Sequence, residues 1–137
     1  MISPTLSLRL SSLLVALVSL TACGFQDDYE LALACRGKVE TLSKKPHEPA
    51  DETSREETRR YAFKLHELEG YACHTWRSDK IACIRSVDDE DTFLHESLTI
   101  HRGPMTVEHV ATLEKKRTGL TREESFQGKC SRAYLSD

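Results

Sequence analysis

The chain of 137 residues has no long hydrophobic run and no catalytic signature. Its apolar stretch at residues 10–20 is about half as long as the roughly 20 residues needed to span a bilayer, which argues against a permanent membrane helix. The sequence contains no G-x-S-x-G, P-loop or dinucleotide-binding fingerprint. We therefore expect neither an enzyme nor a bound cofactor.

The chain also lacks an excess of basic residues and any spaced set of metal ligands. Its formal net charge of −3 makes it a poor candidate for binding nucleic acid, which draws on a basic face. No H-E-x-x-H or H-x-H spacing occurs, and the acidic run 88–91 lacks the spacing of an EF-hand loop. We expect no metal site, and we expect surface or half-buried positions for the histidines, which are His47, His66, His74, His95, His101 and His109.

A lipid-modification signal ends the apolar stretch. Leu20-Thr21-Ala22-Cys23 resembles the lipobox of bacterial lipoproteins, in which cleavage precedes the cysteine and that cysteine carries the lipid. The resemblance implies a signal peptide at 1–22, fatty acyl chains on Cys23 and a membrane anchor. With Arg9 lost from the 19 basic residues, the net charge would go from −3 to −4. The alternative is an ordinary secretory signal cut near Ala22.

The residues after Cys23 predict the cellular location and the domain organisation. Gly24 in place of Asp implies, as a tendency of Gram-negative lipoproteins, sorting to the outer membrane facing the periplasm. Residues 23–28 form a lipidated tether that reaches less than about 20 Å at roughly 3.5 Å per residue. Residues 29–137 suit a single periplasmic domain in length.

Four cysteines remain once Cys23 is set aside, and none forms a C-x-x-C pair typical of zinc ribbons or thioredoxin-like sites. An even number in an oxidising compartment predicts two disulfides, with three possible connectivities. A three-residue turn at 77–79 would pair residue 76 with 80 and place Cys73 opposite Cys83, which leaves Cys35 to pair with Cys130. A one-residue change in register would break that opposition, so the other connectivities remain open.

Alternating polarity predicts strands along most of the domain. Residues 29–41 place Leu31, Leu33, Cys35 and Val39 on one side, and an interior glycine at position 37 favours a strand over a helix. Residues 71–76 and 80–85 form a hairpin signal, and residues 93–101 and 105–113 alternate in the same way. A last strand should run through Phe126 and Cys130.

Two segments are harder to interpret. The stretch 43–58 is polar and contains two prolines, and it predicts an exposed loop. Residues 54–69 combine a capping box of Ser54 and Glu57 with an alternating run from Tyr61, so both a strand and a short helix stay open, with the strand favoured. Altogether we expect a mainly β domain of six or seven strands, an antiparallel meander that closes into a small barrel or sandwich.

The functional expectation is a binding role. Trp76 and Arg77 at the tip of the predicted hairpin are residue types that often anchor protein contacts, although a buried tryptophan is an equally common reading. In size, lipobox and paired cysteines the chain resembles small periplasmic inhibitor and immunity lipoproteins, which implies steric blocking of an envelope-targeting enzyme. The alternative is an accessory or assembly lipoprotein of an outer-membrane complex.

Overall fold

Eight β-strands and no helix make up residues 30–133, the part of the chain that the computed structural model describes. The proposed signal peptide, Cys23, the tether and Tyr29 lie outside the described residues. The strands are β1 (Leu31–Lys44), β2 (Asp51–Lys64), β3 (Glu67–Leu68), β4 (Ala72–Trp76), β5 (Lys80–Asp88), β6 (Thr92–His101), β7 (Thr106–Lys115) and β8 (Leu120–Arg132). The expected mainly β domain is confirmed, with one more strand than the sequence indicated.

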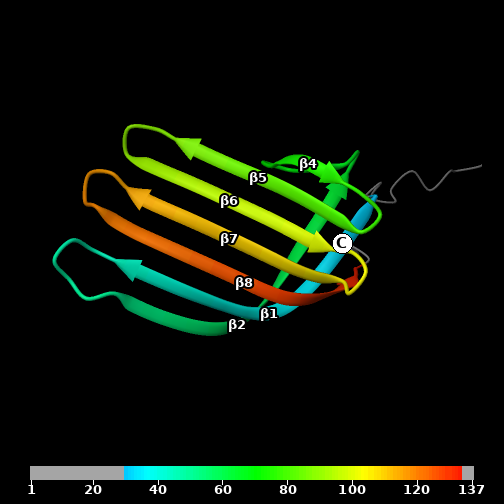
Figure 1. The fold of residues 1–137 in the computed structure, drawn as a ribbon, viewed down its shortest axis with the longest axis horizontal. Helices are drawn as coiled ribbons and strands as arrows, with labels where there is room; N and C mark the ends of the chain where they lie inside the picture. The colour runs from blue at the N-terminus through cyan, green and yellow to red at the C-terminus, as the bar shows by residue number, and fades with distance from the viewer. Residues whose placement is uncertain (1–29, 134–137) are drawn as a thin grey trace, which may run out of the picture.

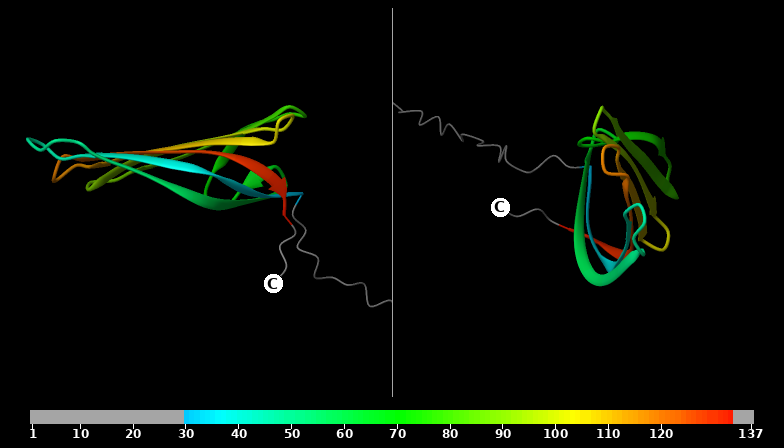
Figure 2. Two further views of the ribbon diagram at one scale, coloured as in Figure 1. Left: turned by 90° about the horizontal axis from the view of Figure 1, so that it is seen from below. Right: turned by 90° about the vertical axis from the view of Figure 1, so that its left-hand side faces the viewer.

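All eight strands belong to one antiparallel sheet in the order β3-β2-β1-β8-β7-β6-β5-β4. The first and last long strands, β1 and β8, are neighbours, so the chain returns to its starting point (Figure 1). The sheet curls until its two ends approach each other, which produces a nearly closed barrel (Figure 2). Within the described residues no helix is long and apolar enough to cross a membrane.

The core fills the inner face of this curled sheet. Leu31, Leu33, Cys35 and Val39 of β1 are buried, as the alternation predicted, because successive side chains of a strand point to opposite faces. The other strands contribute the remaining core side chains, chiefly Tyr61, Phe63, Ile81, Cys83, Leu98, Ile100, Val107 and Phe126.

A pair of glycines allows the strands to curl. β1 and β2 bend near their middle (Figure 1), and β1 stays paired with β8 through the bend, from Leu33 to Lys44. Gly37 at the middle of β1 lies opposite Gly128 of β8. A Cβ atom at Gly37 would lie 1.8 Å from the carbonyl oxygen of Gln127, a distance that no side chain tolerates. The two backbones approach this closely because both residues lack a side chain.

Both disulfides have the expected connectivity. Cys73 opposes Cys83 in the β4–β5 hairpin, and Cys35 opposes Cys130 across β1 and β8, each with a Cα–Cα distance of 3.9 Å. In the chain-entropy model, the bond across 95 residues stabilises the fold by about 4.7 kcal/mol and the one across 10 residues by about 2.7 kcal/mol. The larger contribution therefore comes from the bond that joins the first and last strands.

One detail of the hairpin register differs from the prediction. Trp76 lies opposite Ile81 and not Lys80, because a β-bulge between Cys73 and Thr75 adds a residue to β4. The bulge lies between the turn and Cys73, and it offsets the one-residue change of register at the turn, so Cys73 still lies opposite Cys83.

The predicted loop at 43–58 was wrong. Only residues 45–50 connect the strands, and β2 begins at Asp51. The first half of β2 is exposed on both faces, so it has no hydrophobic alternation to reveal it. Backbone pairing with β1 maintains this part of the strand, with register running from Leu31↔Phe63 to Ser43↔Asp51. The same pairing excludes a helix at 54–64, so the capping box of Ser54 and Glu57 is not used.

The barrel closes by side chains at one line, which we call the seam, with Phe63 and His66 on one side and Trp76 on the other. The strands on either side of it, β3 and β4, are not paired. The Trp76 ring stacks on His66, with ring centroids 4.5 Å apart, and meets the edge of Phe63 at 5.5 Å. Leu65, in the turn that precedes β3, is 81% exposed and has a positive φ of 54°.

The close approach of β1 and β8 yields a stability prediction. We expect Gly37→Ala to lower the free energy of unfolding by about 2–4 kcal/mol, because the added methyl group must push the two backbones apart. Gly103→Ala is the control, since a Cβ at Gly103 meets nothing within 4 Å. Urea unfolding of both variants in oxidised form measures the effect, and equal midpoints would refute the close approach.

Candidate functional site

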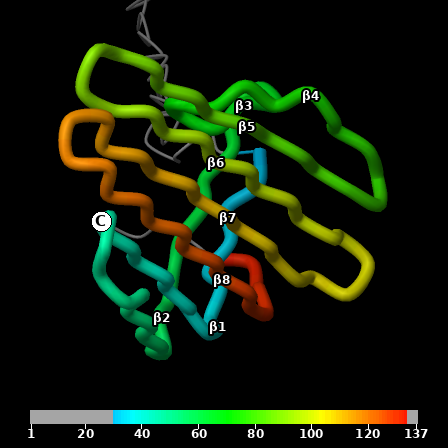
Figure 3. The backbone as a smooth tube through the Cα atoms, turned by 60° about the vertical axis from the view of Figure 1, so that its left-hand side comes forward, coloured from blue at the N-terminus to red at the C-terminus, as the bar shows by residue number. Residues whose placement is uncertain are grey.

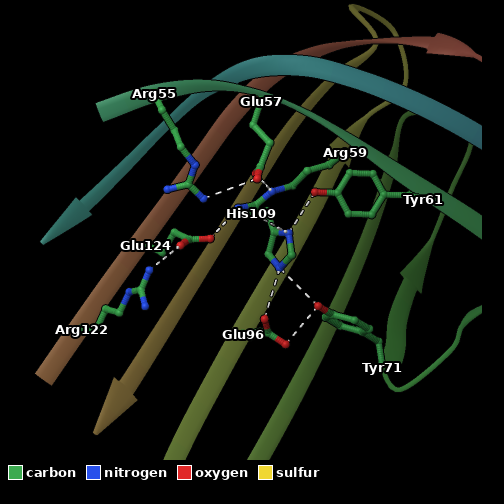
Figure 4. A network of polar contacts seen from close by, with 9 residues as sticks. All are labelled: Arg55, Glu57, Arg59, Tyr61, Tyr71, Glu96, His109, Arg122 and Glu124. Atoms are coloured by element: carbon green, nitrogen blue, oxygen red, sulfur yellow. Dashed lines mark hydrogen bonds and ion pairs between the residues drawn. The ribbon is translucent and has the colours of Figure 1, made fainter. Parts of the chain in front are cut away.

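Beyond the apolar core, the inner face of the sheet carries a network of polar side chains (Figure 4). They come from β2, β6, β7, β8 and the segment before β4, and they are Arg55, Glu57, Arg59, Tyr61, Tyr71, Glu96, His109, Arg122 and Glu124. Regular alternation places them on one face. On β2, for example, Glu57 and Arg59 precede the buried Tyr61 at intervals of two residues, so all three share one face.

His109 lies at the centre of this network and is only 8% exposed. The expectation that the histidines are surface or half-buried is therefore wrong for this one. Its Nδ1 lies 2.9 Å from the Tyr61 hydroxyl and 3.3 Å from Nη1 of Arg59. Its Nε2 lies 3.3 Å from the Tyr71 hydroxyl and 3.7 Å from Oε1 of Glu96.

These neighbours determine the form of the imidazole ring. A guanidinium group only donates hydrogen bonds, so Nδ1 of His109 must accept from Arg59 and from the Tyr61 hydroxyl. The ring proton is then on Nε2, which donates to the Tyr71 oxygen, and Tyr71 donates in turn to Glu96 at 3.0 Å. Burial, together with the charge of Arg59, holds the pKa of His109 below its ordinary value, although Glu96 and Glu124 oppose this shift.

Arg59 connects the network to the apolar core. Its Nε donates to Glu57 at 2.6 Å and its Nη2 donates to Glu124, while the guanidinium carbon lies 4.7 Å above the centre of the Phe126 ring. Burial alone would lower the pKa of Arg59, but the hydrogen bonds to Glu57 and Glu124 outweigh it and the net shift is upward. Arg59 is therefore a charged group whose partners are all provided by the protein itself.

The hydroxyl groups of the two tyrosines on either side of His109 stay protonated at neutral pH. Burial raises the pKa of Tyr71 to about 12, and the carboxylate of Glu96 adds to the shift. Burial also raises the pKa of Tyr61. Both hydroxyls therefore keep their protons and act as hydrogen-bond donors.

The network is chemically satisfied by its own members. The lone pair of His109 that a general base would use is occupied by Tyr61 and Arg59. Glu57 pairs with Arg59, and Glu124 contacts both Arg59 and Arg122. Glu96 lies 3.6 Å from Arg85, which stands outside the network. No group of three potential metal ligands gathers anywhere in residues 30–133. This arrangement closes the polar end of the core.

The predicted contact residues Trp76 and Arg77 separate into two environments. Trp76 is half-buried in the seam and packs against the core, whereas Arg77 is exposed in the turn that follows it. The turn is well ordered by backbone bonds: Arg77 N–H donates to Lys80, and Arg102 donates to the carbonyls of Arg77 and Asp79. These hydrogen bonds hold the hairpin tip in place, and Arg77 is an exposed side chain on it.

The acidic run 88–91 lies against a basic run, Lys115–Arg117. The acidic turn after β5 meets the basic turn after β7, where Lys116 contacts Asp88 and Arg117 contacts Asp91, both at 2.5 Å. All four side chains are well exposed, so these pairs add little stability.

A groove of about 470 Å³ lies on the opposite, outer face, near the far ends of β1, β2 and β8. Leu42, which is 42% exposed, stands between the carboxylates of Glu52 and Glu123, which flank it on the two neighbouring strands. A third carboxylate, Glu40, lines the same groove. The groove is therefore acidic around a small apolar floor.

Comparison with known proteins gives no relative. No family model, no curated protein and no solved structure matches the chain. Residue chemistry and geometry alone therefore support the functional proposal below.

The geometry of His109 predicts a pH dependence of stability. Its pKa in the folded protein lies below the ordinary value of 6.5, so the unfolded chain takes up a proton first as the pH falls. The stability that neutral His109 contributes is complete above that ordinary value and is lost as the pH falls below it, by at most about 1.4 kcal/mol per pH unit.

We expect His109→Gln to flatten the decline in unfolding free energy between about pH 7 and pH 5. The control is His74→Gln, because His74 is exposed. Urea unfolding at a series of pH values measures both slopes, and an unchanged slope in His109→Gln would contradict the assignment.

Proposed function

We propose that the protein is a lipid-anchored binding protein of the bacterial envelope, without enzymatic activity, that acts by steric contact with a protein partner. The anchor rests on the lipobox at Leu20–Cys23. The two disulfides suit an oxidising compartment such as the periplasm. The satisfied network around His109 leaves the outer surface, and not the interior, as the place for contact.

The acidic groove around Leu42 is the observation that supports this proposal best. Glu40 is paired with Lys38, but Glu52 and Glu123 form no ion pair within residues 30–133, so these two carboxylates beside an apolar floor complement a basic side chain or loop of a partner. Opposite charges also accelerate the encounter of two proteins. A basic envelope-targeting hydrolase fits this chemistry, with the protein acting as a steric inhibitor or immunity protein. The mildly acidic net charge of −3 also favours the approach of a basic partner.

The position of the groove suits an anchored protein. The described chain begins at Glu30, whose carboxylate contacts His66 in the seam at 2.7 Å. The groove is lined by residues of β1, β2 and β8. These belong to the strand ends beside the β1–β2 loop, which lie opposite the end where β1 begins (Figure 1). A tether from Cys23 would then leave the groove facing away from the lipid.

The Arg77 tip supports a second function, that of an accessory lipoprotein. Trp76 stacks on His66, which itself contacts Glu30, so the tip lies at the end where the tether would enter. A partner that reaches Arg77 would therefore be at the membrane surface, as a member of an outer-membrane complex is.

The anchor has a direct test. We expect intact-mass analysis of the native protein to show a chain that begins at Cys23 and carries acyl groups. Cys23→Ala should move the protein from the membrane fraction to the soluble fraction, because the lipid provides the membrane affinity. A mature form that begins elsewhere without acyl groups would overturn the anchor.

Charge-reversal variants distinguish the two proposed contact surfaces, which are the acidic groove and the Arg77 tip. We expect Glu123→Arg to reduce capture of a basic periplasmic hydrolase by about tenfold or more, while Arg77→Glu reduces co-purification of an outer-membrane complex. Glu114→Arg, an exposed residue outside the groove, is the matched control. The measurement is quantitative pull-down from detergent-solubilised envelopes. Equal capture by Glu123→Arg and Glu114→Arg would exclude the groove.

A further inference from the structure

One long strand edge of the sheet has no partner. β3 pairs only with Phe63 and Lys64 of β2, so residues 51–62 of β2 pair on one side alone, with β1. Figures 1 and 3 show this part of β2 as the border of the sheet. Unpaired backbone groups along such an edge form a template for another strand, and proteins usually avoid long examples.

The sequence of this edge is complementary to itself. Residues 56–60 read Glu-Glu-Thr-Arg-Arg, so the charge pattern reverses sign about Thr58. If the strand pairs antiparallel with its own copy about Thr58, Glu56 lies opposite Arg60 of the second copy and Glu57 lies opposite its Arg59. Opposite charges that face each other directly across strands attract, and the symmetry repeats each pair.

We propose that a second copy of this chain docks along the edge of β2, with a two-fold axis at Thr58. The dimer would extend the sheet across the two copies. Side chains of one face then meet side chains of the same face: Glu56, Thr58 and Arg60 belong to the outer row, and Glu57 and Arg59 belong to the inner row. Thr58 of each copy would meet its own equivalent, a neutral contact on the axis.

Neighbouring registers are less favourable. An axis at Glu57 would oppose two glutamates to each other, and it would also oppose Arg55 to Arg59. An axis at Arg59 would oppose two arginines. Like charges in direct opposition destabilise strand pairing, so the charge pattern selects the register centred on Thr58.

The outer pair is free for this contact. Within residues 30–133 neither Glu56 nor Arg60 forms an ion pair, and both are exposed. Lys38 lies opposite Glu56 in the register of β1 and β2, but its ammonium group pairs with Glu40 at 2.9 Å. The inner pair, Glu57 and Arg59, already interacts within one chain, so Glu56 and Arg60 should determine specificity.

Sedimentation equilibrium of the purified, oxidised protein in mild detergent over a wide concentration range tests the proposal. We expect a reversible dimer, with its dissociation constant raised at least about tenfold by Glu56→Arg or by Arg60→Glu, because each variant turns two attractions into two repulsions. An equimolar mixture of the two variants should restore a heterodimer. In that mixed dimer the two introduced charges, which are opposite in sign, face each other, and the unchanged Glu56 of one copy faces the unchanged Arg60 of the other. Glu114→Arg makes the same charge change on the outer face of β7, away from this edge and from the groove, and it should dimerise as the native protein does.

A cysteine on the axis tests the register itself. Thr58→Cys should form a disulfide-linked dimer on oxidation, since directly opposed strand residues lie within bridging distance. Thr53→Cys, on the same strand away from the axis, should not. Circular dichroism and intact mass establish that each variant is folded with its two native disulfides. A native protein that is monomeric at every concentration, or variant mixtures that fail to associate, would overturn the proposal.

Discussion

The pairing of β1 with β8 is the constraint on which the rest of the fold depends. It brings together the first and last long strands and so converts a row of hairpins into a curled sheet. Three successive inward pairs make it possible: the disulfide between Cys35 and Cys130, the two glycines at 37 and 128, and the packed pair of Val39 and Phe126. The first pair links the strands covalently, the second allows them to approach closely, and the third begins the apolar core.

The interior has two parts with different physical roles. Apolar burial of Leu33, Phe63 and Phe126 drives folding in one half. The other half is a polar network in which Arg59 lies between the aromatic core and two carboxylates. Because burial of an unpaired charge costs far more than burial of a paired one, the members of this network must be present together. The same reasoning explains why its arginines and carboxylates are paired with one another.

Much of the fold could be read from the sequence where a hydrophobic pattern existed. The alternation of Leu31, Leu33 and Cys35 showed β1 because that strand is buried on one face only. The opposition of Cys73 and Cys83 was expected from a short turn. The register at that turn differs by one residue, and a bulge in β4, which no sequence pattern indicated, restores the opposition. The first half of β2 could not be found in this way, because it is exposed on both faces and its backbone pairing leaves no mark on side-chain polarity.

The polar network escaped prediction for a different reason. His109 shares the face of Val107, which indicates an inward direction, but its partners Tyr61 and Arg59 come from β2, which is not its neighbour in the sheet. They meet only because β2 bends across the barrel, and that curvature depends on the two facing glycines. Sequence patterns describe single strands and adjacent pairs well, whereas contacts across a curved interior need the three-dimensional path.

The seam differs from every other junction between strands in this barrel. Elsewhere in residues 30–133 neighbouring strands are joined by backbone ladders, but here Trp76 meets His66 and Phe63 through ring contacts. The turn 69–71, in which Tyr71 N–H donates to Leu68, also links β3 to β4 along the chain. Separating the two sides would break no ladder hydrogen bond and would expose aromatic surface. The barrel could therefore widen at the seam with every strand pair intact, at the cost of these ring contacts and of the bonds that Arg59 and Tyr61 make across the interior.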